Sequence, residues 1–463
     1  MNSNSVLRAA LAALATTTAV AAQWGPVTTP TTPSARQGAM MAFDVLQDRM
    51  LMFGGNAGNE LWSFANGTWT QLQPTVSPSP RQRSAMAANS ITGEILLYGG
   101  IDASGSPSPF AADDTWAWNG TAWQQQAPTS TPLGRARHMM AYDLGRQVTV
   151  LYGGRFNLYQ PTSALAETWE YYGGDWHVVT TINSPPGLTD AAMAYLPAIG
   201  KTVMFGGADN SGNAHDETWT YDGLDWQLVA ITGPKPSARV GARMEAILSR
   251  NVVMLTGGRD PVTQVIQNDS WEFDGTTWRQ LDPLYGGMYP PRSDFAMAHD
   301  FVHDRITAFG GVTANNSLRD DTQQFGAQFQ AFGMGCAGTA GTPQLVLGAL
   351  PVLGTQLRVD IVNLPPGSTL AAMAVGLSRT QWPLGSLPML LTSLGMPGCR
   401  AYTSADALVT LPVVNGTASW TYDLPQIPSQ LGDAYYLQGI GVDPTVNSAG
   451  LTVSNAATIV LGY

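Results

Sequence analysis

Two sets of oppositely charged residues recur along this sequence at fixed distances from six glycine pairs. The residue eighteen positions before each pair is arginine in five of six cases, at Arg36, Arg81, Arg135, Arg239 and Arg292. An acid follows every pair, two positions before an aromatic site, at Glu60, Asp114, Glu167, Glu217, Asp269 and Asp321. Guanidinium groups hold carboxylates in bidentate fashion, so the pattern predicts structural ion pairs that join the repeats. The alternative is that some of these arginines bind an anionic ligand.

The pattern is broken in the fourth and fifth repeats, where other candidate site residues stand. The fourth repeat has Leu188 in place of arginine and adds Asp190 near Glu217. The fifth repeat places Glu245 where the other five have alanine, with Arg243 two residues before it. A glutamate beside Arg243 could be held ionised and oriented, and any pocket chemistry is then expected there. The alternative is a buried structural ion pair. We treat Glu245 and Arg243 as catalytic candidates, and Asp190, Glu217 and the five arginines as ligand-binding candidates.

The elements that must position these residues are short strands joined by tight turns. The glycine pairs begin at Gly54, Gly99, Gly153, Gly206, Gly257 and Gly310, a period of 45 to 54 residues that is typical of a circular repeat array. In five repeats two tryptophans stand seven residues apart, on either side of a turn pair such as Asn66-Gly67. Each repeat therefore predicts four strands. A methionine thirteen residues before every glycine pair is expected to pack between neighbouring sheets.

The sixth repeat lacks its fourth strand. Gln323 replaces the first tryptophan, and the second is missing. At the other end of the domain, Trp24 precedes Arg36 in the way that each fourth-strand tryptophan precedes the next repeat. We therefore expect Trp24 to complete the last sheet and close the ring, which removes its most exposed edge.

These glycine pairs and spaced aromatics resemble the kelch family of β-propellers. The resemblance covers residues 23–330 and implies a six-bladed propeller with a central channel. Thr256, which replaces the aromatic before a glycine pair, and Gln323 depart from the family pattern. Kelch propellers include protein binders and enzymes, so the resemblance does not by itself give a reaction.

After residue 330 the glycine pairs stop, and the pattern of short alternating runs predicts a β-sandwich over residues 331–463. The two cysteines of the chain, Cys336 and Cys399, both lie here, and we expect them to form a disulfide. The expected fold is therefore all-β, a six-bladed propeller followed by a disulfide-pinned sandwich. Trp382 and Trp420 are expected to be core residues, with sugar stacking as the alternative.

Residues 1–22 read as a secretory signal peptide, with Arg8, an apolar run and a small-residue cleavage pattern. We expect a secreted protein, extracellular or periplasmic, with no membrane span. Charged residues make up only 12% of the chain, and its formal charge is −11. Nucleic acid is therefore excluded as an expected partner, because phosphate binding needs a basic surface.

These observations predict an exported, non-enzymatic binding protein that holds a protein or glycan ligand on the propeller, without cofactor or metal. The alternative is a carbohydrate-active enzyme similar to exported sialic-acid mutarotases, with acid–base chemistry at Glu245. The copper radical oxidases with kelch repeats need a cysteine inside the propeller. No cysteine precedes Cys336, so we set that class aside.

Overall fold

We analysed a computed structural model of the chain, which describes residues 24–461 except 57, 103–110, 158, 161, 282–289, 304, 327, 333–334, 350, 352–354, 379–380, 383–384, 398 and 426–433. The predicted signal peptide lies outside the described residues. The chain divides into two compact units, Trp24–Phe325 and Gly326–Tyr463. The boundary lies slightly before the predicted residue 330, because Gln328–Phe332 pairs with a strand of the second unit.

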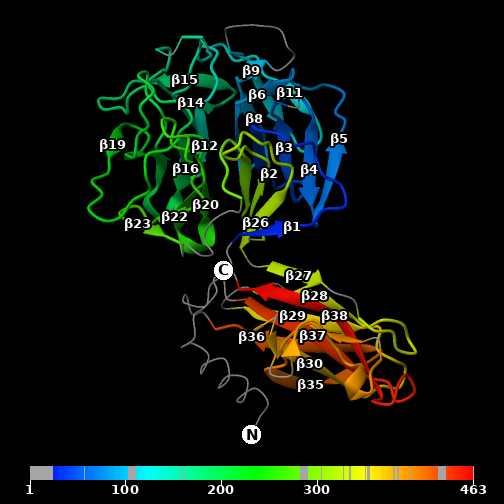
Figure 1. Cartoon of the computed structure of the whole chain (residues 1–463). Coiled ribbons are helices and arrows are strands. Elements are labelled where there is room, and N and C mark those ends of the chain that lie inside the picture. Colours follow the sequence, from blue (N-terminus) through cyan, green and yellow to red (C-terminus); the bar gives the residue numbers. More distant parts are fainter. Residues whose placement is uncertain are drawn as a thin grey trace. The chain divides into compact units, whose positions relative to one another are not determined.

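The first unit is a six-bladed β-propeller, in which each blade is a four-stranded antiparallel sheet (Figure 1). The first three blades are β2–β5 (Ala39–Asp44, Arg49–Gly54, Leu61–Ala65, Thr68–Leu72), β7, β8, β10 and β11 (Ala85–Ala88, Ile95–Tyr98, Thr115–Trp118, Trp123–Gln125), and β12–β15 (Met139–Asp143, Val148–Tyr152, Thr168–Tyr172, Asp175–Val179). The next two are β16–β19 (Ala192–Leu196, Lys201–Phe205, Thr218–Tyr221, Trp226–Leu228) and β20–β23 (Arg243–Ile247, Val252–Thr256, Ser270–Phe273, Trp278–Gln280).

The sixth blade is β24–β26 (Ala296–Asp300, Arg305–Phe309, Thr322–Gly326), completed by β1 (Trp24–Val27). Trp24 pairs with Phe325, and their ring centroids lie 5.6 Å apart. The predicted closure of the ring by the first described strand is therefore confirmed. Small additions to the blades are the ladder of β6 (Arg81–Gln82) with β9 (Ile101–Asp102) and the 3-10 turns η2 (Pro197–Ile199) and η3 (Leu248–Arg250).

The innermost strands pack by placing a methionine of one blade against an alanine of the preceding blade. Met86 shares a core cluster with Ala42, and Met140 shares one with Ala87. The six methionines at this position are all buried, as predicted for packing between sheets. The alanines leave the space that the unbranched methionine side chain fills. In the fifth blade this slot holds Glu245, opposite Met297.

A second contact between blades uses the fourth-strand tryptophans. In five of the six blades, the indole N–H of this tryptophan donates to a hydroxyl at the start of the third strand of the preceding blade, over 2.8 to 3.1 Å. The pairs are Trp24–Ser270, Trp69–Thr322, Trp176–Thr115, Trp226–Thr168 and Trp278–Thr218. The exception is Trp123, whose indole N–H has no partner among the described residues, because Leu61 replaces the hydroxyl residue.

The second unit is built on an eight-stranded antiparallel sheet. The strand order is β27 (Gln328–Phe332), β38 (Leu451–Val460), β37 (Ala434–Val442), β30 (Leu370–Gly376), β35 (Ala407–Val414), β36 (Thr417–Asp423), β29 (Gln356–Val362) and β28 (Gln344–Ala349). β35 pairs with strands on both sides, and one core cluster contains residues from both halves of the sheet. The halves therefore face each other as in a sandwich. Trp420, 5% exposed, lies in this core and is not a sugar-stacking residue.

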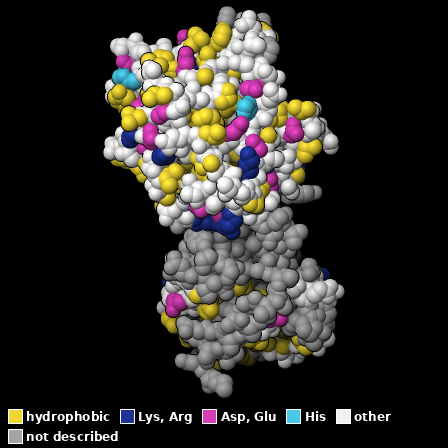
Figure 2. Space-filling model, turned by 90° about the vertical axis from the view of Figure 1, so that its left-hand side faces the viewer, with side chains coloured by type: hydrophobic (Ala, Val, Ile, Leu, Met, Phe, Trp, Pro, Cys, Tyr) yellow, Lys and Arg dark blue, Asp and Glu magenta, His cyan; other side chains and the backbone are white. Residues whose placement is uncertain are grey.

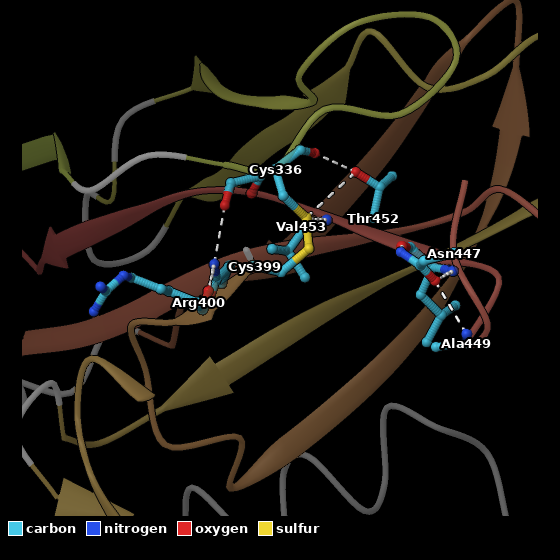
Figure 3. The surroundings of a disulfide bond; sticks show 10 residues. Cys336, Cys399, Arg400, Asn447, Ala449, Thr452 and Val453 are labelled. Atoms are coloured by element: carbon cyan, nitrogen blue, oxygen red, sulfur yellow. Dashed lines mark hydrogen bonds between the residues drawn. A yellow bond between two sulfur atoms is a disulfide. The ribbon is translucent and has the colours of Figure 1, made fainter. Parts of the chain in front are cut away.

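The predicted disulfide joins Cys336 to Cys399, with Cα atoms 5.1 Å apart (Figure 3). Cys336 lies beside β38, since its N–H donates to the carbonyl of Val453 in that strand. Cys399 belongs to an excursion between β30 and β35 that contains β31 (Gln381–Trp382), β32 (Gly385–Ser386), β33 (Met389–Leu390), η4 (Thr392–Leu394) and β34 (Arg400–Ala401). The disulfide therefore fastens this excursion to β38. The side chain of Trp382 lies outside the described residues.

Charged side chains are sparse on the face of the propeller shown in Figure 2, where acidic and basic groups are interspersed. Among the helices in the described part of the chain, none has the length and apolar character needed to cross a membrane.

Candidate functional site

The five arginines of the repeats form locks inside their own blades. Each guanidinium group contacts the acid of the same blade over 2.5 to 3.0 Å and donates to the carbonyl of the first glycine over 3.0 to 3.2 Å. The arginine side chains are 0 to 2% exposed. We call these the rim locks. The partners are Arg36–Glu60, Arg81–Asp114, Arg135–Glu167, Arg239–Asp269 and Arg292–Asp321.

This geometry corrects two parts of the sequence interpretation. The side chains of Arg36, Arg81, Arg135, Arg239 and Arg292 are buried and paired, so they are not available to a ligand at the channel mouth. The ion pairs also lie within blades and do not join one blade to the next. The backbone makes that connection, because the second glycine of each blade donates its N–H to the carbonyl at the arginine position of the following blade, over 2.8 to 3.0 Å.

The first glycine of each pair has no room for a side chain. A Cβ atom at Gly99 would lie 2.3 Å from the carbonyl oxygen of Arg135 in the next blade, and its φ is +66°. The glycine pair is therefore required by the contact between blades.

Four carboxyl groups of the rim locks have a lowered pKa. Burial alone would raise the pKa of the Asp321 carboxyl, but hydrogen bonds and charge from Arg292 outweigh it and lower this pKa to about 2. The same opposing causes lower the pKa of Glu60, Asp114 and Glu167 below their ordinary values.

The fourth blade has no rim lock, because Leu188 is a buried core residue there. Its acid, Glu217, contacts Nδ1 of His215 at 2.8 Å, and Nε2 of His215 contacts Asp209 at 3.3 Å. The Glu217 side chain is 40% exposed. Glu217 is therefore separate from the other candidates of the fourth and fifth blades. Those candidates, Asp190, Arg243 and Glu245, lie along the channel.

A closed circle of backbone hydrogen bonds surrounds the channel mouth. One residue from each blade takes part, two positions after the rim position, and each N–H donates to the carbonyl of the preceding blade over 2.8 to 2.9 Å. All six have positive φ, between 56° and 68°. They are Gly38, Arg83, Arg137, Asp190, Gly241 and Asp294. We call this set the mouth ring. Left-handed backbone at four non-glycine residues is strained, and such strain is concentrated at functional sites.

The charged side chains of the mouth ring meet over the channel. Arg83 contacts Asp294 at 3.0 Å and Asp190 at 3.3 Å, from blades on different sides of the ring. Arg137 contacts Asp190 at 2.7 Å. Burial would raise the pKa of Asp190, but the charges of Arg137 and Arg83 outweigh it and lower it. With Arg259, 3.8 Å from Asp294, arginines outnumber acids here, and these arginines are 12 to 29% exposed.

A polar pocket opens beside the mouth ring, with a volume of about 310 Å³. It is lined by Arg83 and Asp294 of the mouth ring and by the loops of the fifth and sixth blades, including Arg259, Gln264 and Asn316. We call it the mouth pocket. Its volume reaches the range of roughly 300–1,000 Å³ that is typical of ligand sites. Its amide, guanidinium and carboxylate groups offer both hydrogen-bond donors and acceptors.

Glu245 and Arg243 lie deeper in the channel. Nε of Arg243 donates to the carbonyl of Phe295 at 2.7 Å. Burial lowers the pKa of Arg243, and the charges of Asp294 and Asp190 oppose that shift. The prediction that Arg243 holds Glu245 ionised is wrong, because burial raises the pKa of Glu245 to about 8, against the charge of Arg243 and a hydrogen bond with the His299 backbone. The cavity that both side chains line has a volume of about 80 Å³, which is far smaller than a typical ligand site.

One group with metal-ligand chemistry is present in the described part of the chain, formed by Asp48, Asp300 and His303. Nδ1 of His303 contacts Asp300 at 2.8 Å and Asp48 at 3.5 Å, and Arg305 lies 3.6 Å from Asp300. Arg305 thus places one positive charge beside this group.

The mouth ring was missed in the sequence, apart from Asp190. The signal is visible sixteen residues before each glycine pair, where the six repeats read Gly, Arg, Arg, Asp, Gly and Asp. A position that alternates between glycine and charged residues indicates a left-handed backbone with side chains directed to a shared site.

Comparisons with known proteins agree with the fold. The family described as the KLHDC2/KLHL20/DRC7 kelch-repeats domain matches residues 7–196. A solved structure described as "Structure of YjhT" is similar with a TM-score of 0.50 and 16% sequence identity, over 63% of this chain and 95% of that chain. At this identity the likeness shows the fold alone. No curated protein matches the chain.

Proposed function

Because this chain carries a propeller of the kelch-repeat family, whose fold supports a role in binding or interaction, we propose that it is an exported binding protein without enzymatic activity. The ligand, a protein or a glycan, binds in the mouth pocket. Export is supported by the signal-peptide pattern of residues 1–22 and by the disulfide Cys336–Cys399.

The main support for the proposal is that the arginines of the mouth pocket are more exposed and less fully paired than those of the rim locks. The rim arginines are buried and fully occupied by acids and carbonyls. Arg259, in contrast, is 24% exposed, and its nearest carboxylate contact is 3.8 Å away. Its Nη1 donates to Gln264 at 2.9 Å, so the side chain is oriented along the pocket wall. A ligand carboxylate or hydroxyl can replace such long contacts at small cost.

The chemistry of the pocket favours a ligand with several polar groups. Gln264 and Asn316 both have positive φ, at 60° and 55°, on the loops that form the wall. Their amides, with the hydroxyl of Thr313, supply donors and acceptors beside the charge of Arg259. Hydroxyl-rich glycans and polar peptide segments present the complementary groups.

The enzymatic alternative is supported by one observation, the pKa of Glu245. A carboxyl group with a pKa of about 8 can exchange protons near neutral pH, as acid–base catalysis requires. The two cavities that Glu245 lines, of about 80 and 170 Å³, are however both well below the volume of a typical ligand site. The binding function is therefore the better supported.

The proposal is tested by probing glycan and peptide arrays with the purified full chain. We expect a defined set of ligands, whose binding Arg259→Ala weakens about tenfold or more, as expected for a charge-assisted contact. Arg279→Ala is the matched control, because Arg279 is 66% exposed on the outer strand β23. Equal loss with both variants, or no loss with either, would exclude the mouth pocket. Turnover of an array sugar that stops in Glu245→Gln would support the enzymatic alternative.

A further inference from the structure

The channel contains a second cavity at the end opposite the mouth ring. It is formed where the innermost strands end and the turns to the second strands begin, and its volume is about 170 Å³. We call it the lower vestibule. Its walls include Phe43, Tyr142, Tyr195 and Phe301. Leu248 on its lining is 41% exposed, so the vestibule reaches the surface there.

The lining of the lower vestibule differs in kind from that of the mouth pocket. The methionines and alanines of the innermost strands form its inner end, and aromatic rings surround its outer part. Phe43 and Phe301 meet edge to face, with centroids 5.2 Å apart. None of the described residues that line it is lysine or arginine. An anionic ligand therefore has no countercharge in this cavity, whereas an apolar ring finds matching surfaces.

Several polar residues interrupt this apolar lining, among them Ser90, His299 and Glu245. The carboxyl of Glu245 replaces the alanine found in five blades. The hydroxyl of Tyr142 is buried and has no hydrogen-bond partner among the described residues. Because this hydroxyl oxygen is closed to water, the polar contact that the cavity offers to a ligand is assigned to Glu245. Burial keeps the Glu245 carboxyl protonated at neutral pH, so it can donate as well as accept a hydrogen bond.

We propose that the lower vestibule is a second binding site, for a small uncharged ligand made of one ring and a hydroxyl group, such as a phenol. The size fits, because a protein cavity of about 150 Å³ lined by apolar side chains accepts benzene. The ring packs among Phe43, Phe301 and the methionines, and the hydroxyl pairs with Glu245. This site is separate from the mouth pocket in both place and chemistry.

The proposal is tested with 4-fluorophenol and fluorobenzene, which differ by the hydroxyl group. Both are titrated against the full chain and followed by fluorine NMR at slightly acidic pH. We expect saturable binding, with 4-fluorophenol preferred about two- to tenfold, the usual effect of one or two net hydrogen bonds. Glu245→Ala, which restores the alanine of the other blades, removes that preference while fluorobenzene still binds. No saturable binding of either probe at millimolar concentration would overturn the proposal.

Two further variants fix the location. Ser90→Trp places a large side chain on the vestibule lining without changing its core, and should abolish binding of both probes. Arg279→Ala should leave binding unchanged. If Arg259→Ala removes binding and Ser90→Trp does not, the probes occupy the mouth pocket and the proposal is wrong. Thermal unfolding of each variant confirms that it is folded.

Discussion

Arg135 and Arg137 are two residues apart in the same blade, and their surroundings differ in every respect. Arg135 is fully buried, contacts Glu167 at 2.7 Å and donates to two carbonyls. Arg137 is 29% exposed, lies in the strained backbone of the mouth ring and contacts Asp190 of the next blade. Residue type and repetition therefore do not distinguish a structural charge from one that is available to a ligand. Burial and the number of occupied partners do.

The largest change in stability is expected at the rim arginine. Arg135→Ala should lower the free energy of unfolding by roughly 2–4 kcal/mol, because it leaves Glu167 and the carbonyl of Gly153 without their partner. Urea unfolding followed by tryptophan fluorescence measures the loss. Arg137→Ala is the control, with an expected loss of about 1 kcal/mol or less. Equal losses in the free energy of unfolding would show that both arginines are structural.

A second test uses pH to weaken a rim lock. The pKa of Asp321 is about 2 in the folded protein, below its ordinary value of 3.8. The lock therefore contributes stability above about pH 4, and that contribution is lost as the pH falls towards 2. After allowance for solvent screening we expect about 1–2 kcal/mol. Urea unfolding at neutral pH and near pH 3 should show a smaller acid-induced loss for Asp321→Asn than for the natural chain. An identical loss in both would contradict the assignment.

A third test removes a single hydrogen bond from the contact between two blades. Thr115→Val removes the acceptor of the buried Trp176 indole and should cost about 1–2 kcal/mol in urea unfolding. Thr202→Val is a matched control, because the Thr202 hydroxyl is equally buried and has no partner among the described residues. The control should be neutral or stabilising. A larger loss in the control than in Thr115→Val would refute the role of the indole contact.

The smallest effect on stability is expected at the mouth ring. Arg137→Gly removes a contact with Asp190 but relieves the left-handed backbone of a non-glycine residue, φ 59°. These effects nearly cancel, so the free energy of unfolding should change by no more than about 1 kcal/mol. Arg135→Gly, two residues away, should destabilise the propeller clearly. A loss in Arg137→Gly as large as in Arg135→Gly would mean that the mouth ring is a structural lock.

The fold could be predicted closely because it depends on repeated local chemistry. Turn pairs, spaced tryptophans and glycine pairs each have one physical explanation, and Trp24 fits the one strand that the sixth repeat lacks. The position and partners of a side chain depend on tertiary contacts and were harder to predict. The rim arginines were expected to join blades, yet their side chains remain within blades and their backbone carbonyls make the connection.

The candidate site was predicted only in part. Asp190, Arg243 and Glu245 could be selected from the sequence because they break the sixfold pattern. All three lie along the channel. Arg83 and Asp294 did not stand out, since the charge changes sign from blade to blade at that position. Their grouping depends on the positive φ that all six residues share, which a single sequence does not display.

We propose that ligands bind this propeller at the mouth pocket, while the side chains of the rim arginines stabilise their own blades. Hydrogen–deuterium exchange of the full chain, with and without the strongest ligand from the arrays, tests it most directly. Ligand binding in the mouth pocket should slow exchange in the loops 259–266 and 312–316, which form the pocket wall. Slower exchange confined to the second unit, with no change in these two loops, would contradict it.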